Sequence, residues 1–274
     1  MNKEVRNYQE IISQVEELKS SFLVRVIGEV HYDSQHLPLY RLVSEGQGGE
    51  AVLLSGGMHG DEPAGVYGVL KFLKEHASSY MNDFKFFAYP CVNPWGFTAN
   101  TGSNHLGLNI NRHFVFGSKV KEVESILDSL SEGPQTYLFT LDMHETPLEG
   151  EFADANKDEA LPTEFYMWEN CPDKERRVGD KMIASLEQRG IPVCKWESIY
   201  KDVNSGGVIY YPEGFFNQKE YGTGTTFEAF LQVNYTPQAF TTETIDNVSL
   251  EERVEQQIIV LRAALDAKKE TLGF

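Results

Sequence analysis

The sequence is poor in cysteine. Three cysteines, Cys91, Cys171 and Cys194, occur among its 274 residues, and their spacing is not that of a cysteine-based metal site. A disulfide framework is therefore a poor explanation of the fold. We expect inert thiols that are buried or half-buried in the core.

The chain also lacks long apolar runs. No stretch reaches the roughly 20 residues that a helix needs to cross a membrane. The first residues, Met1 to Tyr8, contain no apolar core of a secretory signal peptide. We therefore expect a cytoplasmic enzyme, whose oligomeric state the sequence leaves open.

Basic residues are scarce. Lys and Arg number 24 against 41 Asp and Glu, so the formal net charge is −17 and the sequence pI is near 4.8. Phosphate backbones and anionic lipid surfaces repel a chain of this charge. The balance argues against nucleic acid and membranes as partners.

The chain does have the apolar residues for a large core, since 41% of its residues are hydrophobic and 12% are aromatic. Apolar runs of strand length alternate with segments of helical periodicity, which is typical of a sheet covered by helices on both faces. We predict an α/β fold, a single α/β/α domain over residues 1–274 with a mixed, mostly parallel central sheet. The predicted strands cover 22–28, 39–43, 51–56, 85–92, 137–142, 193–196 and 239–244, and the predicted helices lie near 5–19, 66–73, 122–130, 174–189 and 249–265.

A histidine and a glutamate follow one of these strands. The strand over 51–56 leads into two glycines, after which His59 and Glu62 stand with two residues between them. Pro63 suits the first turn of a helix, so we expect the pair on a tight loop at the carboxyl end of the strand. Imidazole and carboxylate are good ligands for Zn²⁺, which usually takes three protein groups in a catalytic site. Because this spacing is common by chance, the pair needs a third ligand.

His144 is the candidate for the third ligand, because it also lies just past an apolar strand. A lone histidine at such a place is more often a structural side chain with its hydrogen bonds satisfied. Two histidines and a glutamate at strand ends favour a metal site instead, since those ends can be neighbours in a sheet. Asp142 could orient the imidazole of a ligand or cap a turn, and the sequence leaves both roles open.

A hydrolytic zinc site also needs a carboxylate that is not a ligand, to take a proton from water. Glu243 is the best candidate, because it interrupts the apolar and threonine pattern of the last predicted strand. A carboxylate is costly to bury there without a partner. The alternative is an ordinary glutamate that faces solvent, and taken alone the two readings are equally good.

These motifs resemble those of the zinc metallocarboxypeptidases related to carboxypeptidase A, whose relatives include murein-peptide amidases and the succinylglutamate desuccinylase and aspartoacylase branch. The resemblance rests on His59-Gly60-Asp61-Glu62, Asn111-Arg112, His144 and Thr242-Glu243, in that order. It implies that His59, Glu62 and His144 bind one Zn²⁺ and that Glu243 is the general base and acid. It also assigns Asn111 and Arg112 to the free carboxylate of the substrate, and the fork of a guanidinium suits that role.

Two further positions follow from the same resemblance, by counting back from Glu243. Tyr221 falls where these peptidases keep a mobile tyrosine that closes over the substrate. Glu228 falls near the residue that lines their side-chain pocket, where an acid selects basic side chains. Without the resemblance the two are a loop aromatic and a solvated acid, and those simpler readings are slightly favoured.

The chain departs from the family's pattern before Arg112. Family members usually place a second arginine eight or nine residues earlier, but Ser103-Asn104-His105 occupy that stretch. A donor to the developing oxyanion contributes on the order of 3 kcal/mol. We therefore expect Asn104, His105 or another group to substitute, or the activity to be weak or unusual. Asn109 likewise stands where the family often has an aspartate.

The sequence thus predicts a zinc metallopeptidase of the carboxypeptidase kind, acting on an amide bond next to a free carboxylate in a small peptide or acyl-amino acid. One alternative is an N-acyl-amino-acid deacylase of the desuccinylase kind. Those relatives carry an extra C-terminal domain, and the 31 residues after Glu243 favour the peptidase. A zinc-binding protein without turnover is the second alternative, and the presence of a base argues against it.

Overall fold

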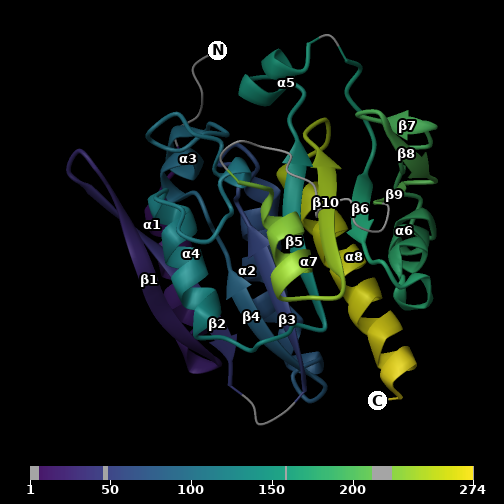
Figure 1. Ribbon diagram of the computed structural model, residues 1–274, viewed down its shortest axis with the longest axis horizontal. Helices are drawn as coiled ribbons and strands as arrows, with labels where there is room; N and C mark the ends of the chain where they lie inside the picture. The colour runs from purple at the N-terminus through teal and green to yellow at the C-terminus, as the bar shows by residue number, and fades with distance from the viewer. Residues whose placement is uncertain (1–5, 46–48, 158, 212–223, 274) are drawn as a thin grey trace.

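The computed structural model describes residues 6–45, 49–157, 159–211 and 224–273, and within them ten strands form one sheet. The strand order is β1-β2-β4-β3-β5-β10-β6-β9-β8-β7 (Figure 1). The strands are β1 (Phe22–Tyr32), β2 (Gln35–Ser44), β3 (Glu50–Gly56), β4 (Phe84–Tyr89), β5 (Phe139–Thr146), β6 (Tyr166–Asn170), β7 (Ser198–Ile199), β8 (Asp202–Ser205), β9 (Val208–Tyr210) and β10 (Ala239–Ile245).

The centre of the sheet is parallel. Strands β4, β3, β5 and β10 pair in parallel, whereas β2 joins β4, and β6 joins β10, in the antiparallel direction. The predicted mixed, mostly parallel sheet is therefore confirmed. The register pairs Gly56 with Met143 and Glu243 with His144, so the carboxyl ends of β3, β5 and β10 lie side by side.

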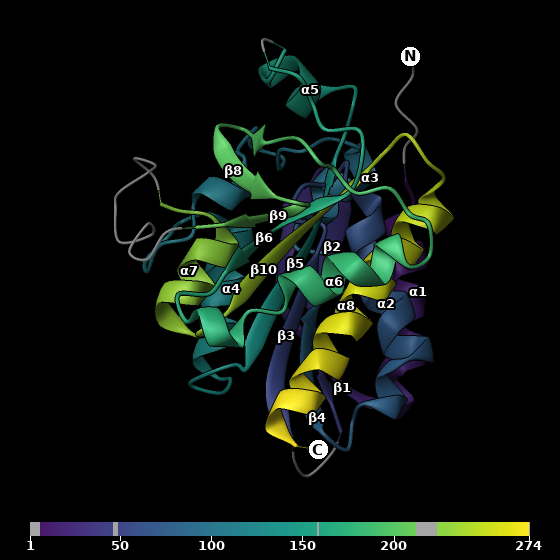
Figure 2. The ribbon, with the colours of Figure 1, turned by 90° about the vertical axis from the view of Figure 1, so that its right-hand side faces the viewer.

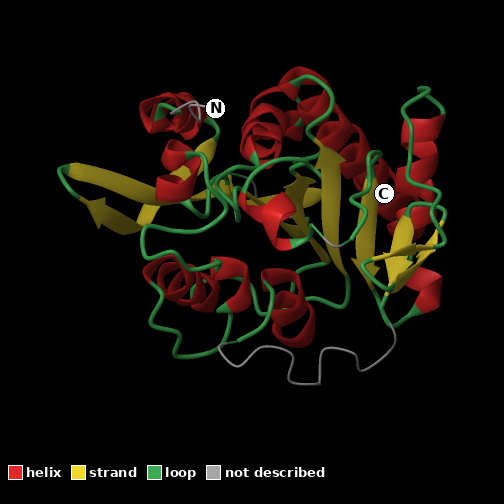
Figure 3. Ribbon diagram, turned by 90° about the horizontal axis from the view of Figure 1, so that it is seen from above, coloured by secondary structure: helices red, strands yellow, loops and turns green. Residues whose placement is uncertain are grey.

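Helices cover both faces of the sheet (Figures 2 and 3). One core packs α1, α2, α6 and α8 against the sheet, and a second core packs α4 and α7 against the opposite face. The helices are α1 (Tyr8–Glu17), α2 (Pro63–Glu75), α3 (Pro94–Ala99), α4 (Lys121–Ser131), α5 (Glu151–Ala155), α6 (Gly179–Glu187), α7 (Phe227–Asn234) and α8 (Leu250–Leu272).

Local sequence explains where the site-bearing elements begin. Pro63 opens α2, so this helix starts directly after Glu62. Ser249 caps α8 through a capping box with Glu252, as the sequence indicates. Strand β5 is buried over its whole length, although apolar and polar residues alternate along most of it. The strand extends to Thr146, so His144 lies within it and not just past its end as predicted.

One predicted strand is wrong. The segment over 193–196 makes a single isolated bridge between Val193 and Phe165, and the strand that pairs with β10 is β6 instead. Val193 and Cys194 are buried as side chains of a connecting segment. Burial without ladder pairing produced the same apolar signal as a strand.

The remaining compositional predictions concern cysteines and membranes. Cys91, Cys171 and Cys194 are free and buried, and burial raises the pKa of each thiol, so they are inert as predicted. In the described part of the chain no helix combines the length and the apolar character of a membrane span.

Candidate metal centre

The loop between β3 and α2 brings His59 and Glu62 to the edge of the sheet. Gly57 takes a positive φ of 65°, which turns the chain sharply after the strand. A Cβ at Gly60 would lie 1.8 Å from the backbone carbon of Gly96, so only glycine allows the loop to pack this closely against α3.

Three ligand-type side chains converge at this edge. The Nδ1 atom of His59 lies 2.6 Å from one carboxylate oxygen of Glu62, and the Nδ1 atom of His144 lies 2.8 Å from the other. All three residues are buried, and their ligand atoms lie within 4.8 Å of one another. Since β5 is the neighbour of β3, residues 82 positions apart meet as the sequence analysis predicted.

The second ring nitrogen of each histidine also has a hydrogen-bonding partner. Nε2 of His59 lies 3.1 Å from Oδ1 of Asn109, and Nε2 of His144 lies 2.9 Å from Oδ2 of Asp142. Ser55 donates a hydrogen bond of 2.6 Å to the other oxygen of Asp142. With a metal ion at the two Nδ1 atoms, these contacts would keep the proton of each ring on Nε2 and leave Nδ1 as a lone-pair donor. Of the two roles left open for Asp142, the structure favours orienting a ligand.

The charges of the cluster also fit a cation. Burial alone would raise the pKa of the Glu62 carboxyl, but the two histidines outweigh it and hold this pKa at about 2. Burial lowers the pKa of His144, yet Asp142 and Glu62 together raise it well above its usual value. The two carboxylates thus favour positive charge between them. Two imidazoles, one carboxylate and a buried position are the donor set of a catalytic zinc site.

Glu145, which the sequence analysis did not single out, stabilises the segment that carries Glu62. Its backbone N–H donates to Glu62 over 3.1 Å, and its side chain accepts from the backbone N–H of Ala64 over 2.6 Å. Arg253 of α8 forms an ion pair with the same carboxylate. Glu145 therefore ties the loop of His59 and Glu62 to the last helix.

Glu243 lies beside this cluster and is not one of its three converging ligands. It is the register partner of His144 on the adjacent strand, it is half-buried, and one of its oxygens accepts a 3.1 Å hydrogen bond from Thr146. Burial raises the pKa of the Glu243 carboxyl to about 8, although His144 acts in the opposite direction. Its position beside the three ligand candidates suits this carboxyl group to accepting and returning a proton.

The cluster opens into a cavity of about 500 Å³. Asn111, Arg112 and Glu228 all line it, together with Glu243 and the three ligand candidates. Oδ1 of Asn111 accepts a 2.8 Å hydrogen bond from the backbone N–H of Phe227, which fixes the loop of Arg112 against α7. Tyr221 lies outside the described residues.

Glu228 is a buried residue, so the simpler reading as a solvated acid is wrong. Thr241 donates a 2.9 Å hydrogen bond to its Oε2, while Oε1 is buried without a hydrogen-bond partner among the described residues. Burial raises the pKa of the Glu228 carboxyl to about 8.

Comparisons with known proteins concern the family and the fold. Residues 48–163 match the family model of the succinylglutamate desuccinylase/aspartoacylase catalytic domain. A presumed metallopeptidase from Shewanella amazonensis superposes with a TM-score of 0.73 at 22% identity, over 95% of this chain and 91% of that one. The chain has the carboxypeptidase fold.

Two carboxypeptidases share this fold. A metallo-carboxypeptidase from Burkholderia cenocepacia gives a TM-score of 0.64 at 14% identity, over 96% of this chain and 69% of that one. Carboxypeptidase A from Helicoverpa armigera gives 0.62 at 13% identity, over 98% of this chain and 76% of that one. No curated protein matches the chain significantly by sequence. The resemblance to metallocarboxypeptidases and to the desuccinylase and aspartoacylase branch is confirmed.

The segment that lacks the family's second arginine does not supply a substitute. Asn104 donates to the buried carboxylate of Glu122 at 3.2 and 3.3 Å, and Nδ1 of His105 lies 3.9 Å from the same carboxylate. Neither residue lines the cavity. Neither of the two named candidates therefore lies at the cavity, and the other expectations, a different group or a weak or unusual activity, remain predictions. Among the described lining residues, Arg112 is the only one with a guanidinium or ammonium group.

Proposed function

We propose that this chain is a zinc-dependent metallopeptidase of the carboxypeptidase kind, with residues 1–274 as a single catalytic domain. It hydrolyses an amide bond next to a free carboxylate. The observation that carries the proposal is the convergence of His59, Glu62 and His144 beside Glu243, a carboxylate that is not part of the cluster.

The proposed roles follow from the chemistry of each group. His59, Glu62 and His144 would hold one zinc ion, which lowers the pKa of a water molecule and polarises the carbonyl to be attacked. Glu243 accepts the proton of the attacking water and returns it to the leaving amine. Thr146 keeps the carboxylate of Glu243 aimed at the cavity through its 3.1 Å hydrogen bond.

Arg112 and Asn111 set the position of the substrate. The guanidinium of Arg112 binds the substrate's free carboxylate with two parallel hydrogen bonds, for which its planar fork is suited. Asn111 supports this loop through its bond to the start of α7. The distance from this carboxylate to the cluster then decides which amide bond is cleaved.

The cavity favours a substrate with a basic side chain. Six of its described lining residues carry carboxyl groups: Glu62, Asp142, Glu159, Asp202, Glu228 and Glu243. Among the described residues, one buried oxygen of Glu228 has no hydrogen-bond partner, and an ammonium or guanidinium group would satisfy it. An acidic side chain would meet like charges instead.

A deacylase of N-acyl-amino acids is the second candidate, because the family model that matches residues 48–163 is that of the desuccinylase and aspartoacylase branch. The two candidates differ in the acyl group, since a peptidase accepts an amino-acid residue there and a deacylase accepts a simple acid. A zinc-binding protein without turnover is disfavoured, because binding alone does not require Glu243.

The test is a matched substrate panel on the zinc-loaded protein. Acyl dipeptides and the corresponding N-acetyl and N-succinyl amino acids are compared by kcat/KM, with Glu243→Gln as the control for contaminating activity. Faster cleavage of the dipeptides supports the peptidase, and faster cleavage of the acyl-amino acids supports the deacylase. Equal rates for wild type and the control on every compound would contradict both.

A further inference from the structure

A second group of metal-ligating side chains lies on the β1–β2 hairpin. Strand β1 is one edge of the sheet, and β7 is the other. Glu29 and His31 stand two residues apart on β1, and His36 on β2 is the direct partner of His31 in the antiparallel pair. Alternation along a strand and direct pairing across it put all three side chains on one face of the hairpin.

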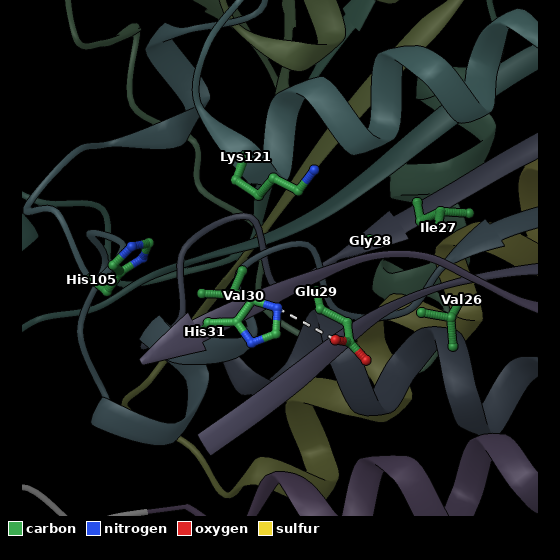
Figure 4. A pocket seen from close by; sticks show the side chains of 8 residues that line it. All are labelled: Val26, Ile27, Gly28, Glu29, Val30, His31, His105 and Lys121. Carbon is green, nitrogen blue, oxygen red and sulfur yellow. Dashed lines mark ion pairs between the residues drawn. The ribbon is translucent and has the colours of Figure 1, made fainter. Parts of the chain in front are cut away.

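The three side chains are already close to one another. Nε2 of His31 lies 3.5 Å from Oε2 of Glu29, a contact drawn as a dashed line in Figure 4, and Nδ1 of His36 lies 4.0 Å from the same oxygen. One ligand atom from each residue lies within 4.8 Å of the other two. The two imidazole rings meet edge to face, with centroids 4.7 Å apart.

One side chain at the hairpin end that carries these residues contacts the body of the molecule. Tyr32, next to His31, stacks edge to face on Trp95 with ring centroids 5.4 Å apart. Tyr32 also lies 6.2 Å from the ring of His105, which faces the same groove as His31. Only a two-residue turn, Asp33 and Ser34, joins the strands. The ligand-bearing residues are therefore held in register, although their side chains are exposed.

We propose that Glu29, His31 and His36 form a second metal site, exposed on the hairpin, for a divalent transition ion such as Zn²⁺. A tetrahedral ion with ligands at about 2.0–2.1 Å needs ligand atoms roughly 3.4 Å apart. The 3.5 Å contact meets this, and small rotations of two exposed side chains bring in the third. Two imidazoles and one carboxylate select zinc-like ions over Mg²⁺ and Ca²⁺, which prefer oxygen ligands.

The hairpin site has the donor set of the buried centre without its support. Asn109 and Asp142 hold the buried histidines through their second nitrogens, whereas no described residue makes such a bond to His31 or His36. Outer partners of this kind are commonly worth 10–100-fold in metal affinity. Zinc should therefore bind in two steps, and the hairpin step should be at least about tenfold weaker.

The experiment is a zinc titration of the metal-free full-length protein by chelator competition, with bound zinc counted by elemental analysis. His31→Gln and His36→Gln are each expected to abolish the weaker step and leave the tighter one unchanged, which also shows that the variants are folded. The matched control is His76→Gln, because His76 lies at the end of α2, remote from both clusters in sequence and packed on Phe72. This control should keep both steps.

Several results would overturn the proposal. A wild-type protein that binds zinc only in the tight step has no hairpin site. Persistence of the weaker step in both hairpin variants, or its loss in His76→Gln as well, would show that zinc binds unspecifically to the surface. Displacement of the weaker zinc by millimolar Mg²⁺ would contradict the ligand chemistry. Loss of the tight step in wild type would count against the proposed function and not against the hairpin.

Discussion

The Asp142→Asn substitution would remove one negative charge from behind His144 while preserving the shape of the side chain. Oδ2 of Asp142 lies 2.9 Å from Nε2 of His144, and each residue is only 2% exposed, so water screens little of this interaction. The amide oxygen of asparagine can still accept the imidazole proton. The change therefore isolates the contribution of charge to the strength of His144 as a ligand.

We expect the substitution to weaken zinc binding by 10–100-fold, which corresponds to about 1.4–2.7 kcal/mol. Because Asp142 and His144 are both buried, we expect the loss of zinc affinity to lie towards the upper end of this range. A substitution that adds a negative charge can be made beside the other histidine, because Nε2 of His59 lies 3.1 Å from the neutral side chain of Asn109. Asn109→Asp adds a charge there and should tighten binding. Since Asn109 is exposed, the gain should stay below roughly tenfold.

The assay is chelator competition for the tight zinc step at one pH, with urea unfolding of the metal-free variants as the control for stability. Unchanged affinity in Asp142→Asn, with the fold intact, would refute the argument that this carboxylate tunes the ligand. Weaker binding in Asn109→Asp would refute the matching argument for His59.

The remaining predictions concern turnover, specificity and stability. Glu243→Gln should keep zinc but lose turnover by roughly 10²–10⁴-fold, and loss of zinc or full activity would remove Glu243 from its role. Arg112→Gln should slow cleavage of free-acid substrates by on the order of 10²-fold and that of their C-terminal amides far less, whereas equal losses would make the arginine structural. Among acyl dipeptides ending in Lys, Leu and Glu, the Lys member should react fastest, and a ranking unaffected by Glu228→Gln would contradict this specificity. In the metal-free protein the folded state holds a proton on Glu228 between the ordinary pKa of 4.5 and about 8, so the unfolding free energy of wild type should fall with pH across that window. Relative to Glu228→Gln the fall should be at most about 1.4 kcal/mol per pH unit, and parallel urea-unfolding curves from pH 5 to 8 would contradict it.

Much of the candidate site could be predicted because its signals are local. The loop of His59 and Glu62 shows as an apolar strand, two glycines and a proline, all within a dozen residues. His144 lies in the second half of β5, and the apolar residues before it mark its strand in the same way. Parallel strands then bring their carboxyl ends together, so the meeting of these residues follows from fold class alone.

The supporting partners could not be predicted, because they depend on distant pairing. Glu145 meets Arg253 across 108 positions, and nothing in the sequence marks either as a partner of the other. Strand β6 was missed because it is only five residues long and follows an acidic, irregular stretch. The position of Asn104 is a similar case, since its role depends on the buried acid Glu122, 18 positions along the chain.

The last helix reaches the metal centre at several points. Gln257 donates a 2.9 Å hydrogen bond to the backbone carbonyl of His144 and accepts one of 2.6 Å from Thr242, while Arg253 holds Glu145. These contacts come from residues that leave the ribosome after every proposed ligand and after Glu243. During synthesis the two histidines and Glu62 are therefore exposed to cellular metals before the framework that fixes them exists. If the proposed centre binds zinc, its complete support exists only once Arg253 and Gln257 have been synthesised, so we expect full metal affinity only late in the biogenesis of the chain.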